Sequence, residues 1–188
     1  MSLAHRRQKR PDLIRHNLLD AALQIVVEEG PQAVTLDAVA RRADVTKGGL
    51  QHHFPNKQAL LDTLFDCLFH DFEGDLQKAI EAEPDTPGRH ARAYIRLAFA
   101  SHADTPSQRA LLLLGLSWPP YAQRWRESCA KALLADGADP ETADRLLLCR
   151  IAADGLWTSQ ITGSYALDEQ RRDNLLQMLL RLCDGAIA

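Results

Sequence analysis

A group of small, polar and basic residues between Thr35 and Lys57 has the chemistry of a nucleic-acid contact. Its lysine, glutamine and histidine side chains can hydrogen-bond to phosphates and to base edges. Two adjacent glycines, Gly48 and Gly49, precede most of them. A glycine pair in a helix costs roughly 2 kcal/mol relative to two alanines, so a gain other than helix stability should favour it. Close approach of the backbone to a phosphate or a base is one such gain, and a simple loop is the alternative.

The pattern of the same segment predicts a short helix, a tight turn, a second short helix and the start of a third. Thr35 and Thr46 are good N-caps for the two short helices. Asp44 lies in the turn, where a left-handed residue is expected. Leu50 and Phe54 lie four apart and can anchor the inner face of the second helix. The spacing therefore predicts a helix-turn-helix whose second helix can enter the major groove of DNA.

Nine residues of this segment are candidates for DNA contact. We expect Lys47, Gln51 and Thr46 to address bases, and the others to address phosphates or to support the helix. Lys57 opposes the macrodipole at the start of the third helix, so a bound phosphate is its expected partner. The full set is Thr35, Thr46, Lys47, Gly48, Gly49, Gln51, His52, His53 and Lys57.

The segment from about Arg15 to Phe65 resembles the DNA-binding domain of the TetR (tetracycline-repressor) family of bacterial transcriptional regulators. The resemblance rests on ALQIVVEEG, TLDAVARRADV and KGGLQHHFPNKQALL. Two positions depart from the family pattern: Asp44 stands where Gly is common, and Gln51 where an aromatic residue, often Tyr, is common. The resemblance implies a three-helix DNA-binding domain, here residues 1–60, and a helical domain for effector binding and dimerisation, here residues 61–188.

Helical periodicity and the scarcity of alternating or β-branched runs predict an all-α chain of about nine helices. Residues 5–10 form a basic stretch that is either a solvated, disordered tail or an arm that follows the DNA backbone or minor groove. Beyond the helix-turn-helix, the expected helices cover residues 12–29, 57–83, 89–103, 106–115, 121–135, 140–162 and 169–184.

Charge is distributed unevenly along the chain. The net charge is −3, which argues against a protein whose whole surface is basic and binds nucleic acid. Residues 1–60, however, carry nine Lys and Arg against six Asp and Glu, whereas the remainder carries thirteen against nineteen. A basic N-terminal segment, residues 1–60, followed by an acidic remainder suits phosphate binding that is confined to the N-terminal segment.

Catalytic and metal-binding patterns are absent from the sequence. His52 and His53 are adjacent, so on a helix they point about 100° apart and cannot share a metal ion well. We find no HExxH, P-loop or GxSxG pattern, and expect neither an enzyme nor a metal or other cofactor. Cys67, Cys129, Cys149 and Cys183 form no CxxC pair and are expected to be reduced thiols in a cytoplasmic protein without a membrane partner.

An effector cavity is expected among the body helices. Aromatic side chains and a few polar ones are candidates for its wall, although each alone is more often ordinary core. Asp154 lies on an otherwise apolar stretch, where it could pair with a buried base such as Arg150 or orient a ligand. The wall candidates are Cys67, Phe72, Tyr94, Phe99, His102, Trp118, Tyr121, Trp125 and Trp157.

The resemblance also implies that the last two helices pair with those of a second subunit as a four-helix bundle, the alternative being packing within one subunit. A dimer doubles the short recognition helix across a two-fold axis. The interface candidates are Leu146, Leu147, Ile151, Leu156, Ile161, Leu175, Leu176, Leu179 and Leu182.

These patterns predict a ligand-responsive DNA-binding regulator. We expect a repressor that binds a palindromic operator on double-stranded DNA as a homodimer and is released by a largely apolar small molecule. The alternative is a helical small-molecule-binding or protein-interaction module without operator binding.

Overall fold

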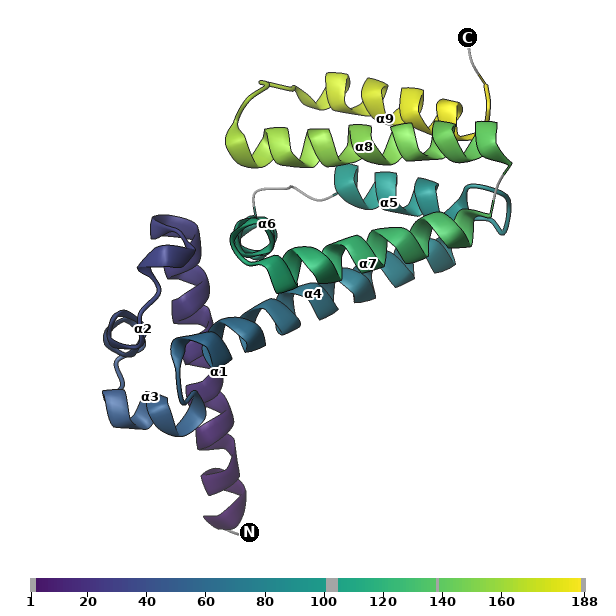
Figure 1. The fold of residues 1–188 in the computed structure, drawn as a ribbon. Coiled ribbons are helices and arrows are strands. Elements are labelled where there is room, and N and C mark those ends of the chain that lie inside the picture. Colours follow the sequence, from purple (N-terminus) through teal and green to yellow (C-terminus); the bar gives the residue numbers. More distant parts are fainter. Residues whose placement is uncertain (1–2, 101–104, 138, 187–188) are drawn as a thin grey trace. The chain divides into compact units, whose positions relative to one another are not determined.

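The computed structural model describes residues 3–100, 105–137 and 139–186. Within them lie nine α-helices and one 3₁₀ turn, and no strand (Figure 1). The elements are α1 (Leu3–Glu29), η1 (Pro31–Ala33), α2 (Leu36–Arg42), α3 (Lys47–His53), α4 (Lys57–Ala82), α5 (Arg89–Ala100), α6 (Pro106–Ser117), α7 (Pro119–Asp136), α8 (Pro140–Thr162) and α9 (Glu169–Cys183). The all-α prediction is confirmed.

The chain divides into two compact units. The N-terminal unit contains Met1–Phe69 and Pro106–Tyr121, and the C-terminal unit contains His70–Thr105 and Ala122–Ala188. Helix α6, which the sequence assigned to the body, therefore belongs with the helix-turn-helix. Helices α4 and α7 each contribute residues to both units.

Helix α1 begins earlier than the sequence predicted. The expected start was about Asp12, directly after Pro11, a residue that lacks an N–H and cannot donate the usual helical hydrogen bond. In the structure Pro11 lies inside a helix that starts at Leu3. The basic stretch at residues 5–10 thus lies within α1.

The helix-turn-helix is held in shape by local caps at its helix starts. Thr35 Oγ1 accepts a 3.1 Å hydrogen bond from the Ala38 amide, and Thr46 Oγ1 accepts one of 3.1 Å from the Gly49 amide. Asp44 has φ of 53°, the left-handed conformation predicted for the turn. All three predictions are confirmed, because each depends on residues within a few positions of one another.

The core of the N-terminal unit is built from the inner faces of its helices. Helix α6 packs against α1, and Tyr121 stacks on Phe65 with ring centroids 4.2 Å apart. The Tyr121 hydroxyl donates a 2.7 Å hydrogen bond to Asp62 Oδ1 on α4. The largest fully buried side chains of the unit are Leu18, Ile25, Val26, Val34, Leu50, Phe54, Leu60, Leu61, Phe65 and Leu114.

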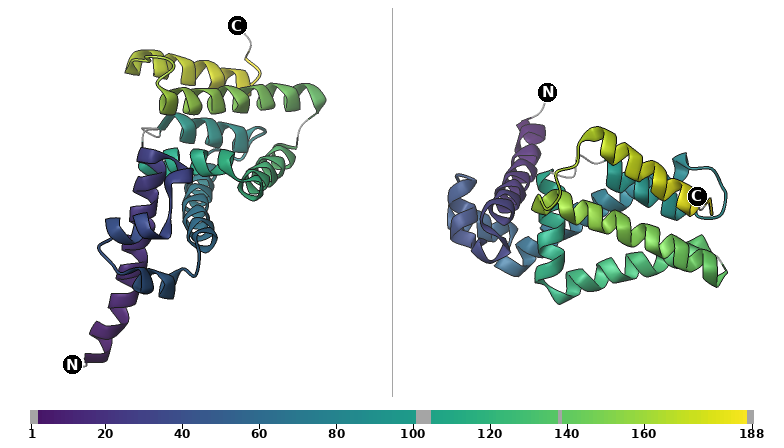
Figure 2. Two further views of the ribbon diagram at one scale, coloured as in Figure 1. Left: turned by 60° about the vertical axis from the view of Figure 1, so that its left-hand side comes forward. Right: turned by 90° about the horizontal axis from the view of Figure 1, so that it is seen from above.

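In the C-terminal unit, α5 packs against both α8 and α9, which lie side by side (Figures 1 and 2). An ion cluster around the buried Glu83 links the end of α4 to α5: Arg92 Nε lies 3.2 Å from Glu83 Oε2, and Arg96 Nε lies 2.5 Å from Glu83 Oε1. Asp139 caps α8 through the Glu141 and Thr142 amides, as Asp-Pro-Glu predicts. The core residues of this unit are Ala91, Tyr94, Ile95, Phe99, Leu146, Cys149, Ala153, Leu156, Leu180 and Cys183.

Candidate functional site

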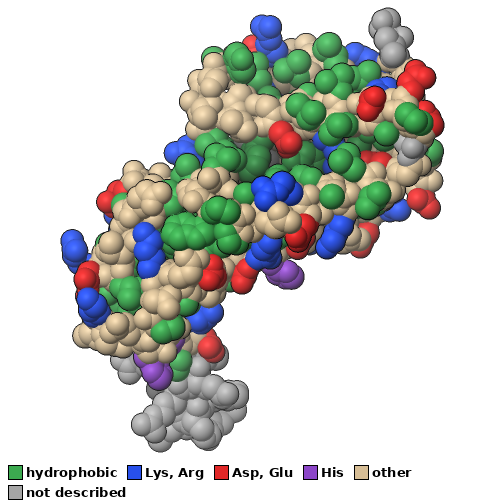
Figure 3. Space-filling model, viewed as in Figure 1, with side chains coloured by type: hydrophobic (Ala, Val, Ile, Leu, Met, Phe, Trp, Pro, Cys, Tyr) green, Lys and Arg blue, Asp and Glu red, His purple; other side chains and the backbone are tan. Residues whose placement is uncertain are grey.

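Helix α3 has one buried face and one exposed face. Leu50 and the C-cap Phe54 are fully buried, and the Arg15 guanidinium lies over the Phe54 ring at 4.6 Å from its centroid. Gln51 and His52 are exposed on the opposite side. Histidine side chains reach the surface at the lower end of this unit in Figure 3. The structure thus presents a short polar helix to solvent on a rigid support.

Lys47, at the start of α3, forms an ion pair with α2. Its ammonium lies 3.0 Å from Asp37 Oδ1 and 3.1 Å from Asp37 Oδ2. Both side chains are more than half exposed, so the pair contributes no more than about 1 kcal/mol to stability. A phosphate could therefore compete for the lysine at little cost.

The two glycines of α3 have different surroundings. A Cβ added at Gly48 would meet no atom of the protein within 4 Å. A Cβ added at Gly49 would lie 3.2 Å from Thr46 Oγ1, the atom that caps the helix. The contact with the cap of α3 thus favours glycine at position 49, whereas no contact in the structure requires glycine at position 48.

Lys57, expected to bind phosphate, makes contacts within the protein. Its Nζ donates hydrogen bonds of 3.3 Å to the carbonyl oxygens of Pro31 and Gln32. These carbonyls belong to η1, so Lys57 ties the start of α4 to the segment between α1 and α2. One of its three N–H donors is left for another partner.

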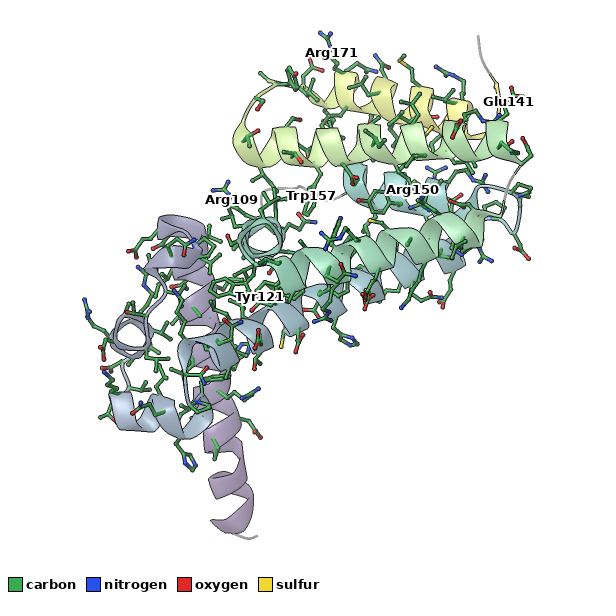
Figure 4. The ribbon with its side chains drawn as sticks, in the orientation of Figure 1. Arg109, Tyr121, Glu141, Arg150, Trp157 and Arg171 are labelled. Carbon is green, nitrogen blue, oxygen red and sulfur yellow. The ribbon has the colours of Figure 1, made fainter. Side chains whose placement is uncertain are left out.

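A cavity of about 160 Å³ lies in the C-terminal unit. Its lining comes from α4, α5, α7 and α8 and is mainly apolar and aromatic. Arg150 and Trp157 project from the same side of α8, on the side away from Arg171 of α9 (Figure 4). The lining residues are Phe72, Leu76, Tyr94, Trp125, Ser128, Cys129, Ala132, Leu133, Leu147, Arg150, Ile151 and Asp154.

Two charged side chains of α8 reach this cavity, and each is held by a different partner. The Tyr94 hydroxyl donates a hydrogen bond to Asp154 Oδ1. Arg150 Nη2 donates one of 2.8 Å to the buried Asp136 Oδ2. Asp154 therefore forms no direct ion pair with Arg150 in the described part of the chain, which was one of the two possibilities that the sequence left open. Burial raises the pKa of the Asp154 carboxyl, and the Tyr94 hydrogen bond and Arg150 charge offset this in part.

Three of the nine predicted cavity residues, Phe72, Tyr94 and Trp125, line this cavity. Trp157 stacks on Trp125 with ring centroids 5.7 Å apart, and His102 lies outside the described residues. The prediction is corrected for the other four residues. Phe99 lies in the core of the C-terminal unit and Cys67 is exposed on α4. Trp118 and Tyr121 lie in the N-terminal unit.

Sequence reasoning missed the aliphatic and polar part of the cavity wall. Helical spacing could have identified the α8 part of this wall, because Leu147, Ile151 and Asp154 follow one another at intervals of four and three residues and so share one face of the helix. The α7 contribution, Ser128, Cys129, Ala132 and Leu133, has the same helical spacing.

Apolar side chains also lie exposed along α8 and α9 (Figure 3). Of the predicted interface residues, Leu146 and Leu156 are 1% and 8% exposed. That prediction is corrected, since both face the core of their own unit. Leu147 and Ile151 are exposed but border the cavity, and Ile161, Leu175, Leu176, Leu179 and Leu182 are half-buried. Leu148 of α8 and Met178 of α9, which were not among the predicted interface residues, are 56% and 57% exposed.

Comparison with known protein families matches two segments of the chain. Residues 18–64 match the family described as bacterial regulatory proteins, tetR family. Residues 88–184, about half of the chain, match the tetracyclin repressor-like C-terminal domain. The chain belongs to the TetR family. It is thus a member of a family of transcriptional regulators, not of an enzyme family.

Individual TetR-family relatives agree with this assignment. The chain is 32% identical over 99 residues to the HTH-type transcriptional regulator BetI of Rhizobium meliloti (strain 1021), covering 53% of this chain and 48% of BetI. It is 38% identical over 61 residues to the regulator SrpR of Pseudomonas putida, covering 32% of this chain and 29% of SrpR. The chain thus spans about half the length, or less, of the curated relatives that it matches.

Solved structures show the same fold at low sequence identity. A putative transcriptional regulator from Pseudomonas aeruginosa PAO1 aligns with a TM-score of 0.72 at 19% identity, over 93% of this chain and 90% of that one. No helix in the described part of this TetR-family chain is long and apolar enough to cross a membrane.

Proposed function

We propose that this chain is a DNA-binding transcriptional regulator that acts in the cytoplasm, most simply as a repressor. The observation that carries the proposal is the exposed polar face of α3, which starts with Lys47 and two glycines and is anchored from below by Leu50 and Phe54. A short helix supported in this way can enter the major groove of B-DNA.

Within that surface, we assign base contacts to Lys47 and Gln51. Both are exposed, and glutamine and lysine can each donate to acceptors on base edges. The Thr46 hydroxyl accepts from the Gly49 amide and keeps its own proton to donate. We assign phosphate contacts or support to Thr35, His52, His53 and the remaining donor of Lys57.

We further propose a homodimer joined through α8 and α9. Leu148, Ala152 and Gly155 follow one another at four and three residues on the exposed side of α8, and Met178 is exposed on α9. Two such faces can pair as a four-helix bundle. Two recognition helices on one two-fold axis would then read a palindromic site.

The cavity of the C-terminal unit is the proposed effector site. Its wall includes Phe72 and Leu76 of α4, the helix that begins at Lys57 behind α3. A ligand that binds better to one position of α4 than to another shifts the protein toward that position. Linkage then requires bound DNA to change ligand affinity by the same factor as ligand changes DNA affinity.

Selection of DNA from a random library by the purified protein tests the regulator function. We expect enrichment of a sequence with two inverted half-sites, centred one helical turn or a multiple of it apart. Gln51→Ala should alter the enriched bases, whereas Lys131→Ala, at an exposed lysine of α7, should enrich the wild-type sequence. If no sequence is enriched, the chain is instead a helical binding module without operator function.

A further inference from the structure

We propose, on the basis of the effector role proposed above, that the cavity of the C-terminal unit binds a small organic cation. Its aromatic or aliphatic body would lie against Phe72 and Trp125, and its positive charge beside Asp154. The chemistry is that of a primary or substituted ammonium carried on a compact apolar group.

The size of the cavity limits the ligand. A cavity of about 150 Å³ with an apolar lining accepts one benzene molecule, and this cavity measures about 160 Å³. Its wall is wholly apolar at Leu76, Leu133 and Ile151. A single ring with a short side chain therefore matches its volume.

The Asp154 carboxylate supplies the negative charge. It is half-buried, it accepts a hydrogen bond from the neutral Tyr94 hydroxyl, and it makes no ion pair within the described part of the chain. A charge withdrawn from water without a direct ion-pair partner is unfavourable, and the charge of the nearby Arg150 offsets this only in part. An ammonium in the cavity would supply that partner, and this favours a cationic ligand.

Arg150, the other charged residue of the cavity wall, favours an anionic ligand less than Asp154 favours a cationic one. The Arg150 side chain is only 9% exposed, and its Nη2 lies 2.8 Å from Asp136 Oδ2. Its guanidinium lies over the Tyr94 ring, 5.4 Å from the centroid. Although Arg150 Nε is buried without an acceptor, the charge of the group is already balanced by Asp136.

Aromatic faces supply a second attraction for a cation. The Phe72 and Trp125 rings lie 5.1 Å apart, and Trp157 stacks on Trp125 at 5.7 Å. A cation within about 6 Å of a ring centroid is attracted by the negative face of the ring. Trp125 lines the cavity, so its fluorescence should also report occupancy.

The test compares three ligands of similar size and different charge: benzylamine, benzyl alcohol and benzoate. Tryptophan fluorescence and calorimetry would measure their binding to the purified 188-residue protein at neutral pH, without DNA. We expect benzylamine to bind at least about tenfold more tightly than the other two, which is within the range for a desolvated cation–aromatic contact. Trp125→Phe should remove most of the fluorescence change but not the calorimetric signal.

Variants of Asp154 identify the charged group. Asp154→Asn should remove the preference for benzylamine over benzyl alcohol and benzoate, and Asp154→Glu should retain the preference. Asp144→Asn, at an exposed aspartate of the same helix, should behave as wild type. Circular dichroism of each variant confirms that it is folded before binding is compared.

Three results would overturn the proposal: benzoate or benzyl alcohol binding as tightly as benzylamine, no saturable binding of benzylamine, or an unchanged preference in folded Asp154→Asn. None of these measurements involves DNA. Failure of the cation assignment is therefore distinguishable from failure of the regulator function, which is decided by the DNA selection.

Discussion

The carboxylate of Asp136 and the guanidinium of Arg150, 2.8 Å apart, join the end of α7 to the middle of α8. The other oxygen of the same carboxylate accepts hydrogen bonds of 3.1 and 3.3 Å from the amides of His90 and Ala91 at the start of α5. One buried side chain thus holds together three of the four helices that line the cavity.

Asp136→Ala should strongly destabilise the protein. Removing one partner of a buried ion pair costs about 3–5 kcal/mol, which corresponds to a decrease in Tm of roughly 10 °C in a protein of this size. Thermal unfolding followed by circular dichroism measures the change. The double variant Asp136→Ala with Arg150→Met should recover part of the loss, because the charge left unpaired is then removed. An unaltered Tm in Asp136→Ala would contradict the structural role of the pair.

Asp154→Asn should stabilise the protein near neutral pH. Burial raises the pKa of this carboxyl in the folded state, so folding favours its protonated form. The stabilising contribution of Asp154 is complete below its unfolded pKa of about 3.9 and is lost as pH rises through the folded pKa. At pH 7 the neutral Asn avoids that loss, and we expect Tm to rise by at most about 2–4 °C.

The same comparison near pH 4 provides the control for Asp154→Asn. Because protonation of wild-type Asp154 increases as the pH falls, the two Tm values should approach each other. A gap that stays constant between pH 4 and pH 7 would mean that the charge of Asp154 does not cause the difference. The titratable or charged groups around Asp154 are Tyr94 of α5, Cys129 of α7 and Arg150 of α8, and none of them is altered by the substitution.

Gly48→Ala and Gly49→Ala should have different effects on stability. No atom restricts a Cβ at Gly48, so alanine there should stabilise α3 by about 1 kcal/mol. At Gly49 the added Cβ would press on the Thr46 cap oxygen at 3.2 Å, which should cancel most of that gain. Chemical denaturation of the two variants side by side measures the difference.

Gly48→Ala should also weaken DNA binding even though it stabilises the fold. The proposed reason is that the methyl group would lie between the α3 backbone and the DNA. Titration of the selected operator, followed by fluorescence anisotropy, tests this. Operator affinity equal to wild type in Gly48→Ala would remove the close-approach explanation for this glycine.

Lys47→Ala should weaken operator binding and reduce its salt dependence. If the ammonium leaves Asp37 to contact a phosphate, its loss should reduce the slope of log K against log salt by about 1. If Lys47 instead contacts a base, the slope should stay closer to wild type and the selected sequence should change. Lys57→Ala is a poorer test, because Lys57 also binds the Pro31 and Gln32 carbonyls and its loss should affect the fold.

The four thiols should react at different rates with a disulfide reagent in the native protein. Cys67 is exposed, whereas Cys149 and Cys183 are buried, and burial raises the pKa of both buried thiols. A raised pKa lowers the thiolate fraction at a given pH. We expect one fast thiol, lost in Cys67→Ser, an intermediate one at Cys129, and two that react only on unfolding. Fast reaction of two or more thiols in folded Cys67→Ser would contradict this assignment.

The sequence by itself determined the local structure of the helix-turn-helix. Thr35, Thr46 and Asp44 act on residues within three or four positions, so their roles follow from residue type and spacing alone. The same holds for the inner face of α3, because helical periodicity places Leu50 and Phe54 together. These short-range rules also account for the confirmed helix count.

Only the tertiary structure decided which side chains meet across the chain. The Tyr94–Asp154 and Arg150–Asp136 hydrogen bonds join residues that are 60 and 14 positions apart. The grouping of α6 with the N-terminal unit and the docking of Lys57 on η1 are likewise long-range. Such partners depend on how helices pack, and a charged residue on an apolar stretch has several candidate partners of equal chemistry. The sequence therefore indicated a cavity with Asp154 near it, and the packing of α5, α7 and α8 selected its partner.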